Sequence, residues 1–185
     1  NTITNGANNG ITVESSNYCT IQNNTISNCA SNGIALTSPW SATTHNTIIK
    51  NTVSGIHSGN TSSLGACGWG IGIEKSATYG VSTNKIGDGT AANANNITNC
   101  DAGIVFWNVD DTTNKANGNK IYGNSPYGLG NNVSRITINA ENNWWGSANG
   151  PVNANNTFNV GSQGNKVTDY VDYVPWWDGP YPDGA

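Results

Sequence analysis

The sequence predicts an all-β fold, a right-handed parallel β-helix of about five coils with an aromatic segment closing its C-terminal end. A short phrase (Asn, any residue, Ile or Val, Thr or Ser, Asn) returns along the chain, at residues 1–5, 24–28 and 95–99. A second phrase follows it, with Gly before an aliphatic residue and then alternating side chains, at residues 10–13, 33–36, 70–73 and 103–106. Two recurring phrases in a fixed order indicate a repeat architecture.

The two phrases share one period and the pattern of a strand. Ile3 and Ile26 are 23 residues apart, and so are Ile11 and Ile34. Apolar and polar residues alternate within each phrase, which indicates a strand with one buried face. Such short strands bury their apolar side chains when each period forms one turn of a solenoid, because every strand then pairs with its copy one turn on. We therefore expect ladders of aliphatic residues inside one rod.

Gly and Asn are predicted to form the corners between strands. The Gly before each aliphatic residue indicates a corner that needs either a positive φ angle or a close approach of the chain. Asn tolerates the left-handed region, and its side-chain amide can hydrogen-bond to the Asn of the next coil. Extra residues at roughly 55–68 and 87–94 are predicted to be loops inserted at corners on one face of the rod.

The chain divides into coils and a closing segment. Residues 1–139 carry the repeat, and coils are expected to begin near Asn1, Cys19, His45, Gly80, Gly118 and Ser134. Residues 140–185 lack the repeat and hold four of the seven Trp residues. An open solenoid end exposes strand edges and core side chains, so this segment is predicted to pack on the last coil as a cover within a single domain.

The composition excludes two classes of partner. Charged residues make up 10% of the chain, the net charge is −4, and the basic residues lie singly. A nucleic-acid partner is therefore not expected, because no basic stripe is available to neutralise phosphates. No apolar run approaches the length that spans a bilayer, so membrane insertion is not expected either.

Cysteines and sequons predict a location outside the cell or on its surface. The four cysteines lack the close pairs of a zinc site, which favours disulfides. Counted back from the second phrase, Cys29, Cys67 and Cys100 fall in one column. Adjacent coils alone allow a bridge, so Cys67–Cys100 with Cys19–Cys29 is the preferred pairing and Cys29–Cys67 its main competitor. Sequons for N-glycosylation begin at Asn23, Asn60, Asn96, Asn132 and Asn155.

The coil phrases and the closing sequence NNWWGSANGP, followed by VDYVPWW, resemble a known family. They are similar to the right-handed parallel β-helix repeat proteins of the pectate-lyase-like superfamily, found in bacterial and archaeal surface and periplasmic proteins. The resemblance covers nearly the whole chain and implies the architecture. The superfamily holds polysaccharide lyases, hydrolases, epimerases and members without known chemistry, so the resemblance implies no single activity.

Neither the lyase nor the hydrolase pattern of that superfamily is met. Lyases there need clustered acidic calcium ligands and a basic residue, whereas this chain has one arginine, Arg135. Hydrolases carry Asp clusters and a Gly-His-Gly phrase. Asp110 and Asp111 are adjacent, but the phrase is missing, and His45 and His57 stand alone as expected loop residues.

Alignment of the second phrase predicts one outward column, formed by Glu14, Thr37, Glu74 and Trp107. Glu14 and Glu74 would lie two coils apart, about 10 Å, which slightly exceeds the roughly 6.5 to 9.5 Å of inverting glycosidases. Two solvated carboxylates are the commoner arrangement. No catalytic residue is therefore assigned, and Glu14 and Glu74 are the only candidates considered.

Four aromatic residues near strand ends are candidates for contact with sugars: Trp40, Trp69, Tyr79 and Trp107. Exposed rings could stack on the apolar faces of sugars, and the alternative is that inserted loops pack on them. No metal or other cofactor is expected. Calcium is the one ion considered, at Asp88, Asp110 and Asp111, but their spacing is not that of alternating ligands.

The leading hypothesis for function is a non-catalytic structural or interaction module outside the cell. Its partners would be further copies or other surface-protein subunits, because open strand edges favour pairing. The runner-up is a polysaccharide-active enzyme or carbohydrate-binding module that uses the face of Glu14, Glu74 and Trp107. Ice binding through outward Thr ladders is disfavoured, because Asn, Ala and Gly interrupt the Thr columns.

Overall fold

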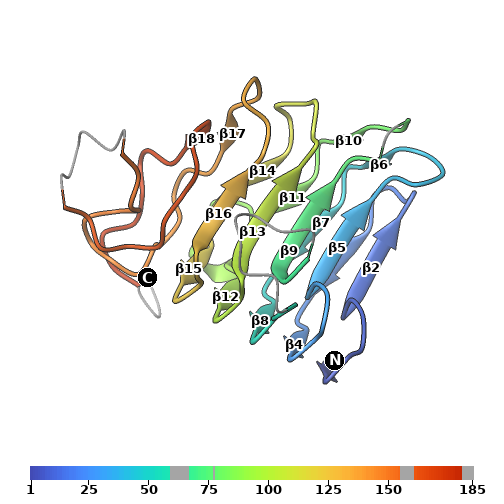
Figure 1. Cartoon of the computed structure of the whole chain (residues 1–185), viewed down its shortest axis with the longest axis horizontal. Coiled ribbons are helices and arrows are strands. Elements are labelled where there is room, and N and C mark those ends of the chain that lie inside the picture. The colour runs from blue at the N-terminus through green and yellow to red at the C-terminus, as the bar shows by residue number, and fades with distance from the viewer. Residues whose placement is uncertain (59–66, 77, 155–160, 181–185) are drawn as a thin grey trace.

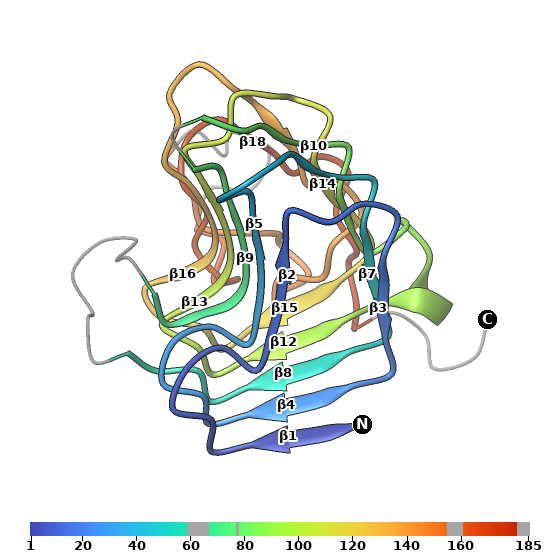
Figure 2. The same cartoon turned by 90° about the vertical axis from the view of Figure 1, so that its right-hand side faces the viewer.

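The structure, a computed structural model, describes residues 1–58, 67–76, 78–154 and 161–180. It is a right-handed parallel β-helix, in which short strands from successive turns stack into parallel sheets around one core (Figures 1 and 2). The predicted fold class is confirmed. Three sheets run along the rod. Each coil contributes one strand to each of them, in the order third sheet, first sheet, second sheet.

The first sheet contains β1 (Thr2–Thr4), β4 (Thr25–Ser27), β8 (Thr52–Ser54), β12 (Asn96–Thr98) and β15 (Lys120–Tyr122). The second sheet contains β2 (Ile11–Glu14), β5 (Ile34–Thr37), β9 (Trp69–Glu74), β13 (Ala102–Trp107) and β16 (Tyr127–Asn131). The third sheet contains β3 (Thr20–Gln22), β7 (Thr47–Ile49), β11 (Lys85–Ile86), β14 (Lys115–Ala116), β17 (Ile138–Asn139) and β18 (Val171–Asp172). A two-stranded pair, β6 (Thr43–Thr44) and β10 (Val81–Ser82), lies between the second and third sheets.

Aliphatic ladders fill the rod as the repeat predicts. In the first sheet Ile3 pairs with Ile26, and the ladder continues through Val53, Ile97 and Ile121. In the second sheet the ladder is formed by Ile11, Ile34, Ile71, Ile104 and Leu129. The inner members of both ladders are fully buried. This burial drives the fold, because it removes a continuous stripe of apolar surface from water.

Gly33, which directly precedes β5, shows why this corner needs Gly. Gly33 does not have a positive φ angle. A Cβ there would lie 2.5 Å from the carbonyl oxygen of Gly70 in the next coil and would also meet Val53. Of the two explanations, close approach between coils is therefore the one that holds for Gly33.

Asparagines, most of them buried, form hydrogen-bonded ladders at two corners, as predicted. At the corner before the first sheet, each side-chain amide donates to the next, through Asn1, Asn24, Asn51, Asn95, Asn119 and Asn143, at 2.8–3.1 Å. A second ladder at the corner before the third sheet joins Asn46, Asn84 and Asn114. The same amides also donate to backbone carbonyls, for example Asn51 to Ile21 and Ile49. These ladders satisfy backbone groups that the corners would otherwise bury without partners.

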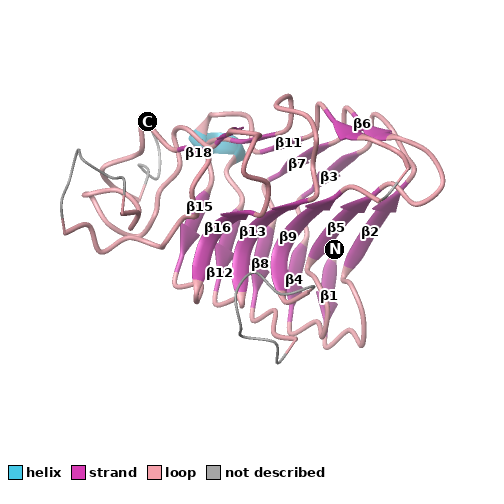
Figure 3. Cartoon of the chain, turned by 45° about the horizontal axis from the view of Figure 1, so that its top comes forward, coloured by secondary structure: helices cyan, strands magenta, loops and turns pink. Residues whose placement is uncertain are grey.

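The two insertions lie at different corners, so the prediction that they share one face is wrong. Residues 55–68 join β8 to β9, between the first and second sheets, and 59–66 lie outside the described residues. Residues 87–94 join β11 to β12, between the third and first sheets, and include the 3-10 helix η1 (Ala91–Asn93), the one helical segment of the described chain (Figure 3). The second insertion forms one wall of a pocket on the outer face of the first sheet.

The cysteines require a correction, because all four are free thiols in the structure. Cys29 and Cys100 occupy the same place, two residues after β4 and β12, and each thiol donates to a strand carbonyl, of Ser27 and Thr98. The intervening coil places Ile56 there, so Cys29 and Cys100 are two coils apart. Cys67 follows the insertion and leaves this column. Counting back from the second phrase failed because inserted residues separate Ile56 from Cys67.

The closing segment stays in register with the last regular coil. Trp144 pairs with Lys120, Val167 pairs with Leu129, and β18 pairs with β17. Trp145 is fully buried in the main core. The division at residue 140 and the role of the segment as a cover remain predictions, while these pairings place Trp144, Val167 and β18 beside the last regular strand of each sheet.

Candidate functional site

The outward column of Glu14, Thr37, Glu74 and Trp107 exists as predicted, since these residues pair in register on neighbouring strands. Glu14 is exposed and Glu74 is half-buried. Burial raises the pKa of the Glu74 carboxyl. Two strand spacings put the two carboxyls about 10 Å apart. The column therefore supplies one carboxyl of raised pKa without a second acid at the distance that glycoside hydrolysis uses.

Trp69 does not fit its predicted role in sugar contact, because it is only 1% exposed. Its ring lies over the backbone of Gly72, where a Cβ would be 2.5 Å from ring atom Cε3. The Trp107 ring packs beside it, with 5.7 Å between ring centroids. Trp107 remains half-buried. For Trp69 the packing alternative is thus the correct one.

Trp40 and Tyr79 are exposed on the corner between the second and third sheets, and Trp40 is 77% exposed. Tyr18, which the sequence reasoning missed, is equally exposed at this corner and stacks on His45, with 4.8 Å between ring centroids. The Ser15 hydroxyl accepts a hydrogen bond from the Trp40 backbone N–H at 3.0 Å.

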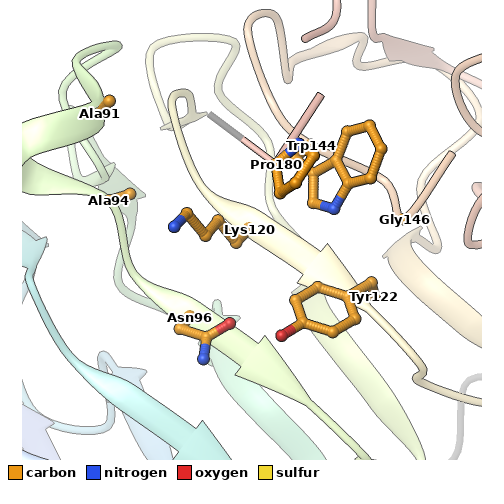
Figure 4. A pocket seen from close by; sticks show the side chains of 8 residues that line it. All are labelled: Ala91, Ala94, Asn96, Lys120, Tyr122, Trp144, Gly146 and Pro180. Carbon is orange, nitrogen blue, oxygen red and sulfur yellow. The ribbon is translucent and has the colours of Figure 1, made fainter. Parts of the chain in front are cut away.

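A pocket of about 500 Å³ lies on the outer face of the first sheet at its C-terminal end (Figure 4). Its floor comes from β12, β15 and the segment that pairs with β15, and its walls come from the second insertion and the C-terminal segment. The lining residues are Ala91, Ala94, Asn96, Lys120, Tyr122, Trp144, Gly146 and Pro180. Because the floor is a stack of strands, the polar and aromatic groups are held on a rigid surface.

The floor follows from the register of the sheet. Asn96 pairs with Lys120, and Lys120 pairs with Trp144, so these three side chains form one column. Tyr122 lies beside the column and is 39% exposed. Gly146, with φ +86°, keeps the space next to Tyr122 open, because a Cβ there would approach the Tyr122 Cβ to 2.8 Å.

The chemistry of the pocket combines two aromatic rings with polar groups. Trp144 and Tyr122 offer ring surface, and the Lys120 ammonium group points away from the two rings, toward the side of Ala94 (Figure 4). The buried Oδ1 of Asn96 has no hydrogen-bond partner among the described residues. Such a set can stack on an apolar face, donate to oxygen atoms and attract negative charge.

Sequence reasoning missed this pocket, although a signal was present. Asn96, Lys120 and Trp144 each precede the inward residue of their strand, as Thr2, Thr25 and Thr52 do earlier in the chain. The register of the first phrase predicts this column in the same way as the register of the second phrase predicts the column of Glu14 and Glu74. The walls had no such signal, because they come from an insertion and from Pro180.

The acidic and histidine candidates are spread among separate local contacts. Asp88 accepts hydrogen bonds from Thr90, Asp110 pairs with Lys75 at 3.1 Å, and Asp111 accepts from Thr113. The described residues contain no group of three or more His, Cys, Asp or Glu that could hold a metal ion. The three aspartates considered for calcium are therefore not brought together.

Of the sequon residues, Asn23 and Asn132 are exposed and Asn96 is half-buried in the pocket. Asn60 and Asn155 lie outside the described residues. Accessibility to a glycosylating enzyme thus favours Asn23 and Asn132.

Among the described residues, no helix has the length and apolar character needed to cross a membrane. Comparison with curated proteins and with solved structures finds no match. One family model matches residues 1–65. The description of that family as periplasmic agrees with the predicted location outside the cytoplasm. The first third of the chain is thus similar to the NosD family, described as periplasmic copper-binding proteins.

Proposed function

We propose that the chain is a non-catalytic extracellular β-helix module that binds glycans at the pocket of Asn96, Lys120, Tyr122 and Trp144. The observation that carries the proposal is the pairing of Lys120 with Trp144, which places a lysine and an indole on neighbouring strands of one rigid face that lines the pocket. Sugars present apolar ring faces together with hydroxyl and carboxylate oxygens. A floor of rings and polar groups matches both features.

Substitution of Trp144 tests the proposal. Titration calorimetry with short oligogalacturonides and cello-oligosaccharides should detect binding to the unaltered chain. Trp144→Ala should weaken it about tenfold or more, the equivalent of roughly 1.4 kcal/mol. Trp40→Ala is the matched control, because Trp40 is exposed but outside the pocket, and it should leave the affinity unchanged. Equal affinities for both variants and the unaltered chain would refute the proposal.

The enzyme alternative rests on the raised pKa of Glu74 beside Trp107. A general acid needs a raised pKa, but a glycosidase also needs a second carboxyl at the right distance. Incubation with uronic and neutral polysaccharides should give neither unsaturated products nor new reducing ends. Activity that disappears in Glu74→Gln would favour the enzyme instead.

Assembly is a second candidate, favoured by the strand edges of the first coil. Among the described strands, β1, β2 and β3 each hydrogen-bond to a neighbour on one side only. Parallel strands can add to such an edge, so we propose self-association through it as an additional property. Light scattering that gives a concentration-independent monomer mass would argue against it. We likewise propose the closing segment as an end cover and Asn23 and Asn132 as glycan attachment sites.

Copper binding, named for the matched family, does not fit the described donor atoms. Copper sites use Cys, His and Met side chains, and this chain has four Cys, two His and no Met. His57 Nδ1 lies 2.8 Å from Asp101, whereas His45 stacks on Tyr18. No third donor joins either histidine among the residues described. We therefore propose no copper site in this part of the chain.

A further inference from the structure

The outer face of the second sheet holds a carboxylate without a partner. Glu74 is the last residue of β9 and lies beside Trp107 of β13, its partner on the neighbouring strand (Figure 1). Its half-buried side chain makes no hydrogen bond or ion pair with any of the described residues. Burial raises the pKa of the carboxyl. Because partial removal from water is unfavourable for an unpaired charge, a ligand that brings a positive charge to Glu74 would be stabilised there.

An aromatic ring lies next to this carboxylate and is held in place by packing. In-register pairing puts Trp107 one strand spacing, about 4.8 Å, from Glu74. Trp69 packs against Trp107 with 5.7 Å between ring centroids, and the same cluster includes the fully buried Val105. Trp107 itself is only half-buried, so part of its ring surface is available. The face of an indole attracts cations through its quadrupole.

The charges around Glu74 favour a cation over an anion. On its other side, β5 presents the uncharged Thr37. Lys75, the next residue along the chain, pairs with Asp110 at 3.1 Å. Glu14 lies in the same column two strands away, about 10 Å, and carries the same sign of charge. The neighbourhood therefore repels anions and leaves the charge of Glu74 uncompensated.

The donor set suits an organic cation better than a metal ion. Hard metal ions need several oxygen ligands, and no group of three or more His, Cys, Asp or Glu that could hold a metal ion exists in the described part of the chain. An ammonium or guanidinium group can donate N–H hydrogen bonds to one carboxylate, while its aliphatic stem packs on an indole. Alkylamines and the side chains of Lys and Arg share this chemistry.

We propose that Glu74 and Trp107 form a binding site for an organic cation with N–H donors, an ammonium or guanidinium group on an aliphatic stem. The N–H groups donate to the Glu74 carboxylate, and the stem packs on the Trp107 ring. This site lies on the second sheet and does not depend on the glycan pocket of the first sheet. It gives the module a second class of ligand, either a basic side chain of a partner protein or a free amine.

Chemical-shift titration of the backbone amides of β9 and β13 tests the proposal. The probes are pentylamine, Nα-acetyl-lysine methylamide and Nα-acetyl-arginine methylamide, with 1-pentanol as the neutral control. Glu74→Gln should weaken binding of the cations at least tenfold, and Trp107→Leu, which keeps an apolar side chain, should weaken it about fivefold. Glu14→Gln is the matched control, because it removes the same charge from the same column, and it should leave the affinity unchanged. The amide spectrum of each variant also verifies that it folds.

The titration of Glu74 gives a second readout. A bound cation favours the ionised carboxylate, so pentylamine should lower the pKa of Glu74, and the affinity should fall as the pH is lowered through that pKa. Following the side-chain carboxyl carbons by NMR, with and without pentylamine, measures both effects. Glu14 should show no shift. An unchanged Glu74 pKa in the presence of bound pentylamine would overturn the role of the carboxylate.

The remaining outcomes are equally decisive. The proposal is wrong if no cation shifts the β9 and β13 amides, or if 1-pentanol binds as tightly as pentylamine. Equal losses in Glu14→Gln and Glu74→Gln would show a general attraction to negative charge and would also overturn it. Tighter binding of the lysine or arginine amide than of pentylamine would support the site with a partner's basic side chain as its ligand. The reverse order would support it with a free amine.

Discussion

At the scale of single residues, Glu74 carries a measurable cost of folding. Its folded-state pKa is raised by burial above the ordinary value of 4.5. A raised carboxyl pKa stabilises the folded state below that ordinary value, and the stabilisation is lost as the pH rises through the folded-state pKa. At neutral pH the ionised side chain is therefore held in a partly desolvated place.

Glu74→Gln should relieve this cost. We expect the variant to unfold about 1 °C higher near pH 7, corresponding to a few tenths of a kcal/mol at a partly exposed site. The gain should disappear near pH 4, where the native carboxyl is protonated. Thermal unfolding followed by circular dichroism measures both values. Glu14→Gln, on the same column but exposed, should change neither, and a variant less stable than the native chain at pH 7 would contradict the expectation.

The cysteines differ in their expected reactivity. Burial raises the pKa of the Cys100 thiol to about 12, and Cys29 is equally buried. Thiolates are the reactive form, so a thiol that is both buried and protonated reacts slowly. A chromogenic disulfide reagent should modify two thiols, Cys19 and Cys67, in the folded protein and all four after unfolding. Fewer than four thiols in the unfolded protein would show that disulfides form after all.

At the scale of elements, the asparagine ladder should contribute more to stability than any surface strand contact. Asn51 donates to Asn95 and to two backbone carbonyls, and it accepts from Asn24. Asn51→Ala leaves these buried groups without partners, and we expect a loss of about 3 kcal/mol or more in the free energy of unfolding. Denaturant titration measures it. Thr52→Ala, the exposed neighbour, should cost less than about 0.5 kcal/mol.

The close approach of coils at the Gly corners gives a second test at this scale. In Gly33→Ala the added Cβ would press against the carbonyl oxygen of Gly70 and force two coils apart. We expect a loss of about 1 to 3 kcal/mol, comparable to overpacking of a core. Gly80→Ala is the matched control, because no atom lies within 4 Å of the added Cβ. Equal melting temperatures for the two variants would show that the coils can separate without cost.

At the scale of the whole molecule, stability should vary along the rod. Coils contact only their neighbours, so a coil with one neighbour is less stable than a coil with two. In the described part of the chain β1 and β2 pair on one side, whereas β4, β5, β8 and β9 pair on both. Hydrogen exchange followed by mass spectrometry should therefore show faster exchange in residues 1–14 than in residues 25–54. Uniform protection of both segments would contradict this gradient.

The fold was predictable because the repeat presents the same pattern of buried and exposed residues in successive coils. Alternation at Ile26 and Ile34 marks a strand with one buried face, and the common period fixes the pairing of coils. The Asn ladder was also predictable, since an amide that recurs at one corner can satisfy its own copies. The choice between a positive φ angle and close approach at Gly33 needed the positions of neighbouring coils.

The candidate site was largely hidden from the sequence for a different reason. Lys120 and Trp144 lie in degenerate copies of the first phrase, and Pro180 reaches the pocket from a distant part of the chain. Inserted residues also change the distance between the first and second phrases. The position of Cys67 relative to the second phrase therefore predicted the wrong column for it. The burial of Trp69 depends on packing against Gly72 and Trp107, and no periodic pattern encodes that packing.

The Asn ladder has a consequence for how such a molecule can change size. Asn24 and Asn51 occupy equivalent places, so the segment from one to the next is one complete coil whose two ends have the same structure. A tandem copy of residues 24–50 would continue the hydrogen-bonded Asn ladder and add one coil to the rod. The rod could then lengthen by gene duplication, because no new kind of contact between coils would be needed.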